Sequence, residues 1–117
     1  MRILSPESIS SADLFARIRE IVARLLPGIR YRLYLFGSRV QGQATRRSDY
    51  DLGIMADGVL PLSTLSRIRE ELEKIPVLQR IDFVDLSAAN PAFVAIALKT
   101  SQLIDERGSL PLPAGRL

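Results

Sequence analysis

Two short stretches of the sequence carry side chains whose types and spacing could do chemistry. Gly37 and Ser38 follow a short apolar run, and after ten intervening residues comes the carboxylate pair Asp49 and Asp51. Glycine lets the backbone approach a phosphate closely, and the serine hydroxyl and nearby amides can donate hydrogen bonds to phosphate oxygens. On a strand, residues two apart project from one face, roughly 6.5 to 7 Å apart, so both carboxylates could reach a pair of cations. The pattern indicates metal-assisted transfer of a nucleotidyl group.

A third carboxylate is expected on a later strand, because a two-metal site usually needs one more ligand. The candidates are Asp82 and Asp85. Ile81 and Phe83 would share one face of this strand and look like core residues, so Asp82 would point to the opposite face, where a site could lie open. Asp85 stands near the end of the strand and suits a turn or a cap. We therefore predict that Asp82 is the third acidic residue of the site.

Three arginines, Arg39, Arg46 and Arg47, stand between the Gly-Ser pair and the aspartates. Arginine forms bidentate contacts with phosphate, and we expect Arg39 and Arg47 to bind the nucleotide, although an exposed arginine is as often only solvated. A simpler interpretation is a scaffold, in which Gly-Ser marks a turn and Asp51 lies at an exposed strand edge. The ordered combination, with a strand before Gly37 and another at Asp51, favours a site.

The composition narrows the chemistry and the class of protein. The 117 residues include no cysteine and no histidine, so a metal would need oxygen ligands, which indicates Mg²⁺ or, as the alternative, Mn²⁺. The net charge is +3 without a dense basic run, so we do not expect direct binding to nucleic acid. Because the sequence shows neither an apolar run of roughly 20 residues nor a signal-peptide pattern, we expect a cytoplasmic protein without membrane contact.

Apolar periodicity and turn residues predict the elements that would position these groups. In chain order we expect a helix over 10–26, a strand over 31–36, a short helix over 39–44, a strand over 50–55, a helix over 61–75, a strand over 77–86 and a helix from Asn90. The buried side of this last helix is expected to include Phe93, Val94, Ile96, Ala97, Leu103 and Ile104. The order predicts an α/β (α+β) fold, with a small mixed sheet of about three or more strands covered by helices. We expect one domain over 1–108 and a flexible C-terminal tail over 109–117.

The motif residues resemble the nucleotidyltransferases of the DNA polymerase beta superfamily, and most closely the minimal nucleotidyltransferases of prokaryotes. The family pattern of Gly-Ser, Asp-x-Asp and a later Asp corresponds here to Gly37-Ser38, Asp49-Tyr50-Asp51 and Asp82. The similarity extends over residues 12–108 and includes a closing helix expected over 91–108. It implies a polymerase-beta-like fold, ATP as the substrate and two Mg²⁺ ions.

The same resemblance implies a role for each motif residue. Gly37 and Ser38 would hold the β- and γ-phosphates, and Asp49 and Asp51 would bind both metal ions. Asp82 would complete the catalytic metal site and help to deprotonate the acceptor hydroxyl. That hydroxyl would then attack the α-phosphate, and pyrophosphate would leave.

Relatives of this size often pair with a small helical HEPN protein as a toxin–antitoxin module. The resemblance therefore implies an antitoxin that transfers AMP from ATP to a HEPN toxin. Two alternatives stay open. The chain could neutralise its partner by binding alone, in which case Asp49→Ala or Asp51→Ala would leave inhibition intact. It could also be a small-molecule nucleotidyltransferase whose acceptor pocket forms across a homodimer.

Overall fold

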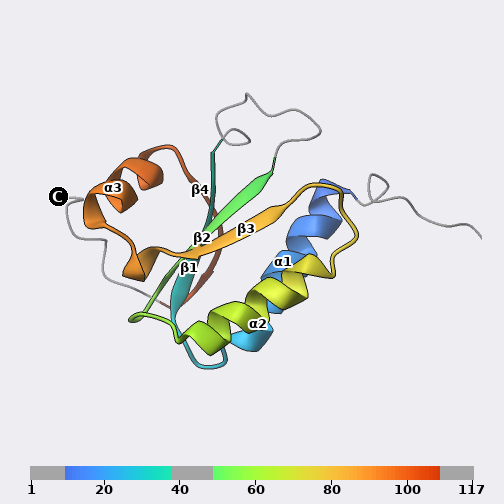
Figure 1. Cartoon of the computed structure of the whole chain (residues 1–117), viewed down its shortest axis with the longest axis horizontal. Helices are drawn as coiled ribbons and strands as arrows, with labels where there is room; N and C mark the ends of the chain where they lie inside the picture. The colour runs from blue at the N-terminus through green and yellow to red at the C-terminus, as the bar shows by residue number, and fades with distance from the viewer. Residues whose placement is uncertain (1–9, 38–48, 109–117) are drawn as a thin grey trace, which may run out of the picture.

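A computed structural model describes residues 10–37 and 49–108 of the chain. The helices are α1 (Ser11–Leu25), α2 (Leu62–Glu73) and α3 (Pro91–Lys99), and the 3₁₀ turn η2 covers Leu86–Ala88. The strands are β1 (Tyr31–Phe36), β2 (Tyr50–Ala56), β3 (Ile81–Asp85) and β4 (Gln102–Arg107). Within the described residues the strands form one four-stranded mixed sheet in the order β3-β2-β1-β4 (Figure 1).

Local sequence signals explain where α1 and α3 begin. The Ser10 hydroxyl oxygen accepts a hydrogen bond of 3.1 Å from the Asp13 amide at the start of α1. The Asn90 side chain accepts one of 2.8 Å from the Ala92 amide, and Pro91 occupies the first turn of α3. Each side chain satisfies an amide that has no partner within its own helix. Both predicted helix starts are confirmed.

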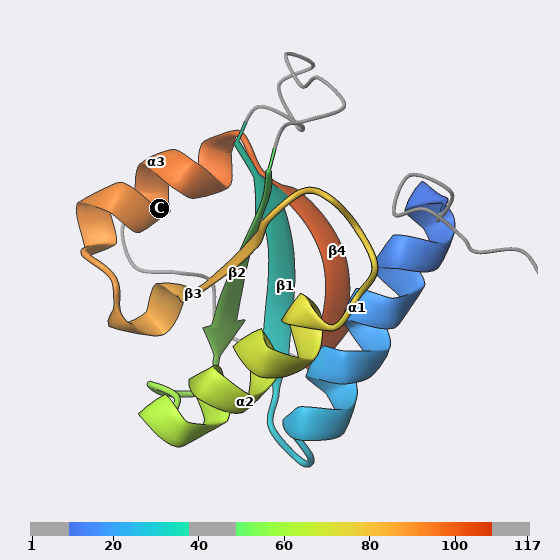
Figure 2. The ribbon, with the colours of Figure 1, turned by 45° about the vertical axis from the view of Figure 1, so that its right-hand side comes forward.

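The sheet joins two kinds of strand pairing. Strand β1 runs antiparallel to both β2 and β4, whereas β2 and β3 are parallel and are connected through α2. Helices α1 and α2 lie side by side on one face of the sheet, and α3 lies on the other (Figure 2). Parallel pairing places the beginnings of β2 and β3 next to each other, which decides where the acidic residues meet.

The hydrophobic core lies between the sheet and the α1–α2 layer. Alternate residues of β1 and β2 face this layer, so Leu33, Leu52 and Ile54 are fully buried. Tyr50 is also buried, and its ring packs edge-on against Phe15 with 5.9 Å between the ring centroids. Tyr50 and Leu52 thus both belong to the core. The intervening residues of the strands therefore face the α3 side.

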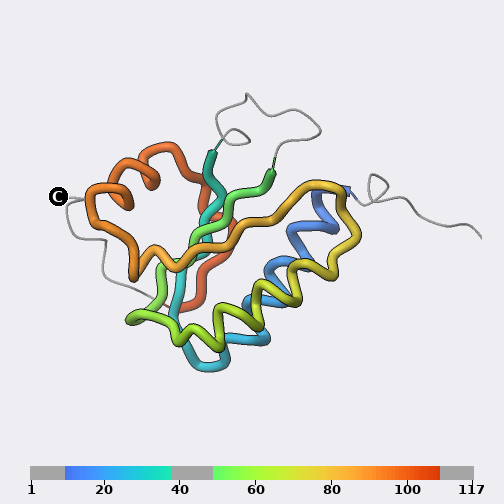
Figure 3. Tube along the Cα trace, viewed as in Figure 1, coloured from blue at the N-terminus to red at the C-terminus, as the bar shows by residue number. Residues whose placement is uncertain are grey.

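The predicted closing helix over 91–108 is wrong in its second half. Helix α3 ends at Lys99, and β4 follows and pairs with β1 (Figure 3). Leu103 and Ile104 consequently lie on a strand rather than on a helix face. Without β4, the outer edge of β1 would expose a row of unpaired backbone groups, and pairing satisfies them.

The predicted buried side of the last helix is also only partly correct. Val94 is buried, whereas Phe93 is 49% exposed and Ile96 is 67% exposed. The third strand is shorter than the predicted 77–86, because its hydrogen-bonded part covers Ile81–Asp85. The expected short helix over 39–44 and the tail over 109–117 lie outside the described residues, and the domain boundaries stay predictions. None of the described helices is long and apolar enough to span a membrane.

Candidate functional site

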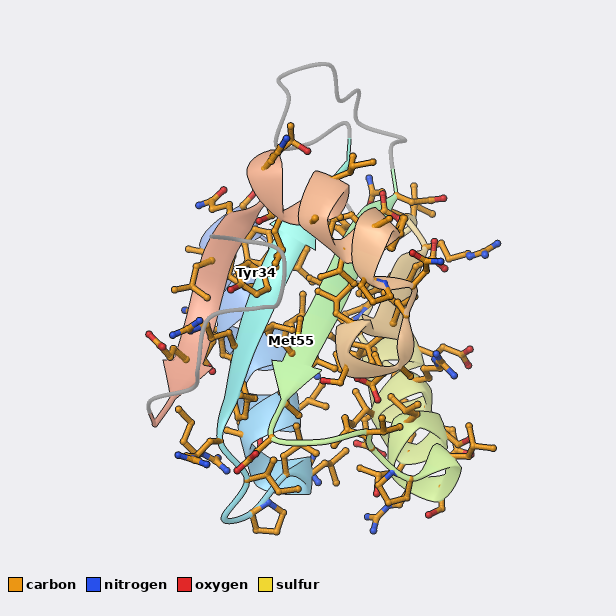
Figure 4. All side chains as sticks on the ribbon, turned by 90° about the vertical axis from the view of Figure 1, so that its left-hand side faces the viewer. Tyr34 and Met55 are labelled. Atoms are coloured by element: carbon orange, nitrogen blue, oxygen red, sulfur yellow. The ribbon has the colours of Figure 1, made fainter. Side chains whose placement is uncertain are left out.

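Asp51 and Asp82 lie directly opposite each other on adjacent strands. The parallel register of β2 and β3 pairs these two residues, and the antiparallel register of β1 and β2 pairs Phe36 with Asp51. Neighbouring strands are about 4.8 Å apart, so the two carboxylates start from closely spaced backbones. Both side chains project from the face of the sheet that carries α3, because alternate residues share a face. Tyr34 and Met55 mark the same face (Figure 4).

Gly37 closes this site at the end of β1. Its backbone has a φ of +91°, a conformation that side-chain-bearing residues rarely adopt. A Cβ atom at this position would collide with Oδ2 of Asp51. Glycine is therefore required both by the turn and by the close approach of the Asp51 carboxylate to the backbone. Ser38, Arg39, Arg46 and Arg47 lie outside the described residues, so their predicted contacts stay predictions.

Asp49 lies just before β2 and points toward the beginning of β3. Its Oδ1 atom accepts a hydrogen bond of 3.2 Å from the backbone amide of Arg80. The carbonyl oxygen of Arg80 in turn accepts one of 2.9 Å from the Tyr50 amide. The guanidinium Nε of Arg80 donates to Oδ1 of Asp82 over 2.9 Å. Arg80 thus contacts both acidic residues that flank Asp51.

The surroundings of Asp51 raise the pKa of its carboxyl. Partial burial raises the pKa of its carboxyl, and the negative charges of Asp82 and then Asp49 raise it further, while Arg80 acts in the opposite direction. The hydrogen bond to Asp82 raises the pKa of the Arg80 guanidinium, which is charged in any case. Like charges held this close disfavour full ionisation unless a cation is present. The site is therefore built to attract positive charge.

The donor set of the site suits a hard divalent cation. The acidic pair offers carboxylate oxygens, which are the ligands that Mg²⁺ prefers, and the whole sequence contains no cysteine or histidine that would favour a softer metal. Within the described ranges, no group of three or more potential ligands is close enough to hold one ion together. Asp51 and Asp82 form a pair, and Asp49 lies beside them in contact with Arg80.

A groove of about 830 Å³ runs along β3 and includes the acidic pair. Besides Asp51 and Asp82, it is lined by Arg80 and by apolar side chains that include Phe36 and Phe93. Its volume lies within the range of small-molecule sites, and its lining combines a few polar groups with apolar walls, as such sites commonly do. The carboxylates are thus reachable by a ligand.

Asp85 has a structural role, as its position near the strand end predicted. Its side chain is buried and accepts hydrogen bonds of 2.9 Å from the amides of Leu60 and Ser87. It caps the 3₁₀ turn η2 and points to the core side of β3, away from Asp82. Arg80 was not among the predicted site residues, although it lies two positions before Asp82. The same strand alternation that selects Asp82 puts Arg80 on the face of Asp82, but gives it no role in the site.

The family is established by comparison with known proteins. The profile of the family described as "Polymerase beta, Nucleotidyltransferase" matches residues 28–109, which include β1, β2, β3 and the acidic pair. The chain belongs to this nucleotidyltransferase family, in agreement with the resemblance seen in its motif.

Individual proteins and solved structures also resemble this chain. The chain is 31% identical over 99 residues to the "Probable protein adenylyltransferase MntA" of Haemophilus influenzae, covering 85% of this chain and 84% of that protein. It also shares its fold with a chain in the crystal structure of a toxin–antitoxin complex with AMP-PNP. The TM-score is 0.65 at 23% identity, over 77% of this chain and 71% of that one.

A further likeness is to a chain in the structure of the tri-AMPylated HEPN toxin of Shewanella oneidensis in complex with an MNT antitoxin. There the TM-score is 0.60 at 19% identity, over 78% of this chain and 68% of the other. At these identities the two structures show a shared fold, which confirms the expected mixed sheet with its covering helices.

Proposed function

We propose that this protein transfers AMP from ATP to a hydroxyl group on a HEPN-type protein partner and thereby acts as an antitoxin. The observation that carries the proposal is the direct pairing of Asp51 with Asp82 beside Gly37, in a chain of the nucleotidyltransferase family. The H. influenzae relative bears the name of a protein adenylyltransferase, and the structural neighbours include a toxin–antitoxin complex with an ATP analogue and an AMPylated HEPN toxin. These names are the basis for proposing ATP as the donor and a HEPN-type protein as the acceptor.

The carboxylates would hold Mg²⁺, with Asp49 and Asp51 contributing to two ions and Asp82 to the catalytic one. When bound, Mg²⁺ would neutralise the charge that develops on the phosphate oxygens. The turn at Gly37 would let the backbone approach the β- and γ-phosphates, with Ser38 donating from the next position. Arg39 and Arg47 would add positive charge around the triphosphate.

In the proposed reaction the acceptor hydroxyl gives its proton to the Asp82 carboxylate. Its oxygen then forms a bond to the α-phosphorus, while the bond from that phosphorus to the bridging oxygen breaks. Pyrophosphate leaves with the bonding electrons, and AMP remains on the acceptor through a phosphodiester bond. Asp82 is suited to this role because it lies next to Asp51 in the groove.

The setting of the reaction is also proposed. A cytoplasmic location is part of the proposal and follows from the proposed use of ATP as the donor. The net charge of +3 without a dense basic run disfavours a nucleic-acid acceptor, for which a basic surface would be expected.

The test is transfer of label from ATP carrying a radioactive α-phosphate, in the presence of Mg²⁺, to the product of the neighbouring gene. Asp51→Asn and Asp82→Asn should each abolish labelling, because each removes a negatively charged ligand and keeps the side-chain size. Asp57→Asn is the matched control, since Asp57 is an exposed carboxylate paired with Arg30 and is not part of the groove lining. Labelling that survives both site substitutions would refute the assignment. A tight unlabelled complex would indicate an antitoxin that acts by binding alone.

A further inference from the structure

Arg80 contacts both acidic neighbours of Asp51, which are Asp49 and Asp82. Its backbone amide donates to Oδ1 of Asp49 over 3.2 Å, and its guanidinium donates to Oδ1 of Asp82 over 2.9 Å. It stands immediately before β3, so its backbone is fixed by the sheet while its side chain reaches along the strand. These contacts connect two carboxylates that would otherwise only repel each other and Asp51.

The two contacts of Arg80 differ in how easily they can be broken. The bond to Asp49 comes from the backbone, so it persists whatever side chain stands at position 80. The bond to Asp82 comes from a side chain that is 76% exposed and meets a carboxylate that is 37% exposed. An ion pair this open to water is held weakly and is screened by salt. A divalent cation can therefore compete for Asp82 without disturbing the sheet.

We propose that the Arg80 guanidinium is a positioning group that occupies Asp82 while the site is free of metal and yields it when a divalent cation binds. Asp82 is then held in place beside Asp51 before metal arrives, and the repulsion between the carboxylates is offset in the meantime. The inference rests on the proposed metal-dependent function.

The test measures Mn²⁺ binding by calorimetry in the absence of nucleotide, so it does not depend on any transfer activity. Arg80→Gln removes the competing positive charge, and Mn²⁺ should bind about three- to tenfold more tightly at low salt. This gain should shrink as salt is added. Arg80→Lys keeps the charge and should bind Mn²⁺ nearly as the unmodified protein does.

Arg67→Gln is the matched control, because Arg67 is exposed on α2 and is not part of the groove lining. It should leave Mn²⁺ affinity unchanged.

If Arg80→Gln does not fold, Arg80→Met removes the same charge and has a side chain about as long as that of glutamine. Unchanged or weaker Mn²⁺ binding by the neutral variants would overturn the inference, and so would a failure of the unmodified protein to bind Mn²⁺. If the Arg80 variants change Mn²⁺ affinity as expected but the protein does not transfer AMP, only the proposed function is contradicted.

Discussion

Replacing Asp51 by asparagine should stabilise the metal-free protein at neutral pH, although the same change should abolish its proposed activity. Asp51 lies opposite Asp82 in the parallel register, and burial together with its acidic neighbours raises the pKa of its carboxyl. An ionised Asp51 is therefore unfavourable in the folded state relative to the unfolded chain. Asparagine keeps the shape of the side chain and removes the charge.

The size of the effect follows from the strand spacing. Like charges directly opposite each other on neighbouring strands destabilise a sheet by roughly 0.2–1 kcal/mol. Asp51 is only partly buried and Arg80 offsets some of the repulsion, so solvent screening and this cation keep the value within that range. We expect Asp51→Asn to raise the free energy of unfolding by about 0.5 kcal/mol, which corresponds to a melting temperature higher by roughly 2 °C.

The stability difference between the unmodified protein and Asp51→Asn should depend on pH in a direction that can be checked. A carboxyl whose pKa is raised by folding binds its proton more tightly in the folded state, so it contributes stability below its ordinary pKa of 3.8. The unmodified protein loses this stability as the pH rises from 3.8 through the raised folded-state pKa. Asp51→Asn has no such group to titrate. The difference between the two proteins should therefore open with rising pH and become constant at neutral pH.

The assay is thermal unfolding followed by circular dichroism in EDTA, over a pH series. Asp57→Asn serves as the control, because Asp57 forms an exposed ion pair with Arg30 and its loss should not stabilise the protein. Adding Mg²⁺ should stabilise the unmodified protein more than Asp51→Asn. An Asp51→Asn protein that is equally or less stable than the unmodified one in EDTA at neutral pH would refute the electrostatic reasoning.

Two further substitutions separate the site from the scaffold. Gly37→Ala forces a Cβ against the Asp51 carboxylate and a side chain into a left-handed backbone, so it should cost about 1–2 kcal/mol and lower label transfer; unchanged transfer and urea stability would contradict the close approach. Asp85→Ala leaves the buried amides of Leu60 and Ser87 without their acceptor and should cost about 1–3 kcal/mol in urea unfolding. Transfer by the folded Asp85→Ala protein should be retained, and a selective loss of transfer would mean that Asp85, too, serves the site.

The choice of Asp82 over Asp85 shows what local patterns can predict. A strand turns alternate residues to opposite faces, and the apolar Phe83 identifies the face that must be buried. The structure buries Phe83 and places Asp82 beside Asp51. Asp85 faces the core side and is tolerated there because two backbone amides satisfy its carboxylate. Strand parity and local capping thus predict this part of the site from the sequence.

Strand β4 shows where local patterns fail. Four of its six residues are charged or amide side chains, and the adjacent apolar pair Leu103 and Ile104 fits a helix face as well as a strand. What decides the matter is the unpaired edge of β1, a partner far away in the sequence. Arg80 was missed for a related reason, because an arginine near a strand end is usually only solvated. Its significance depends on the strand pairing that brings Asp49, 31 residues earlier in the chain, to it.

The central claim is that this site transfers AMP rather than phosphate. The most direct measurement compares ATP labelled at the α-phosphate with ATP labelled at the γ-phosphate, each incubated with the protein, Mg²⁺ and its partner. The account predicts that the partner acquires only the α-label, that the γ-label is released as pyrophosphate, and that Asp82→Asn abolishes the transfer. Incorporation of the γ-label into the partner would show that the site transfers phosphate instead, and would contradict the account.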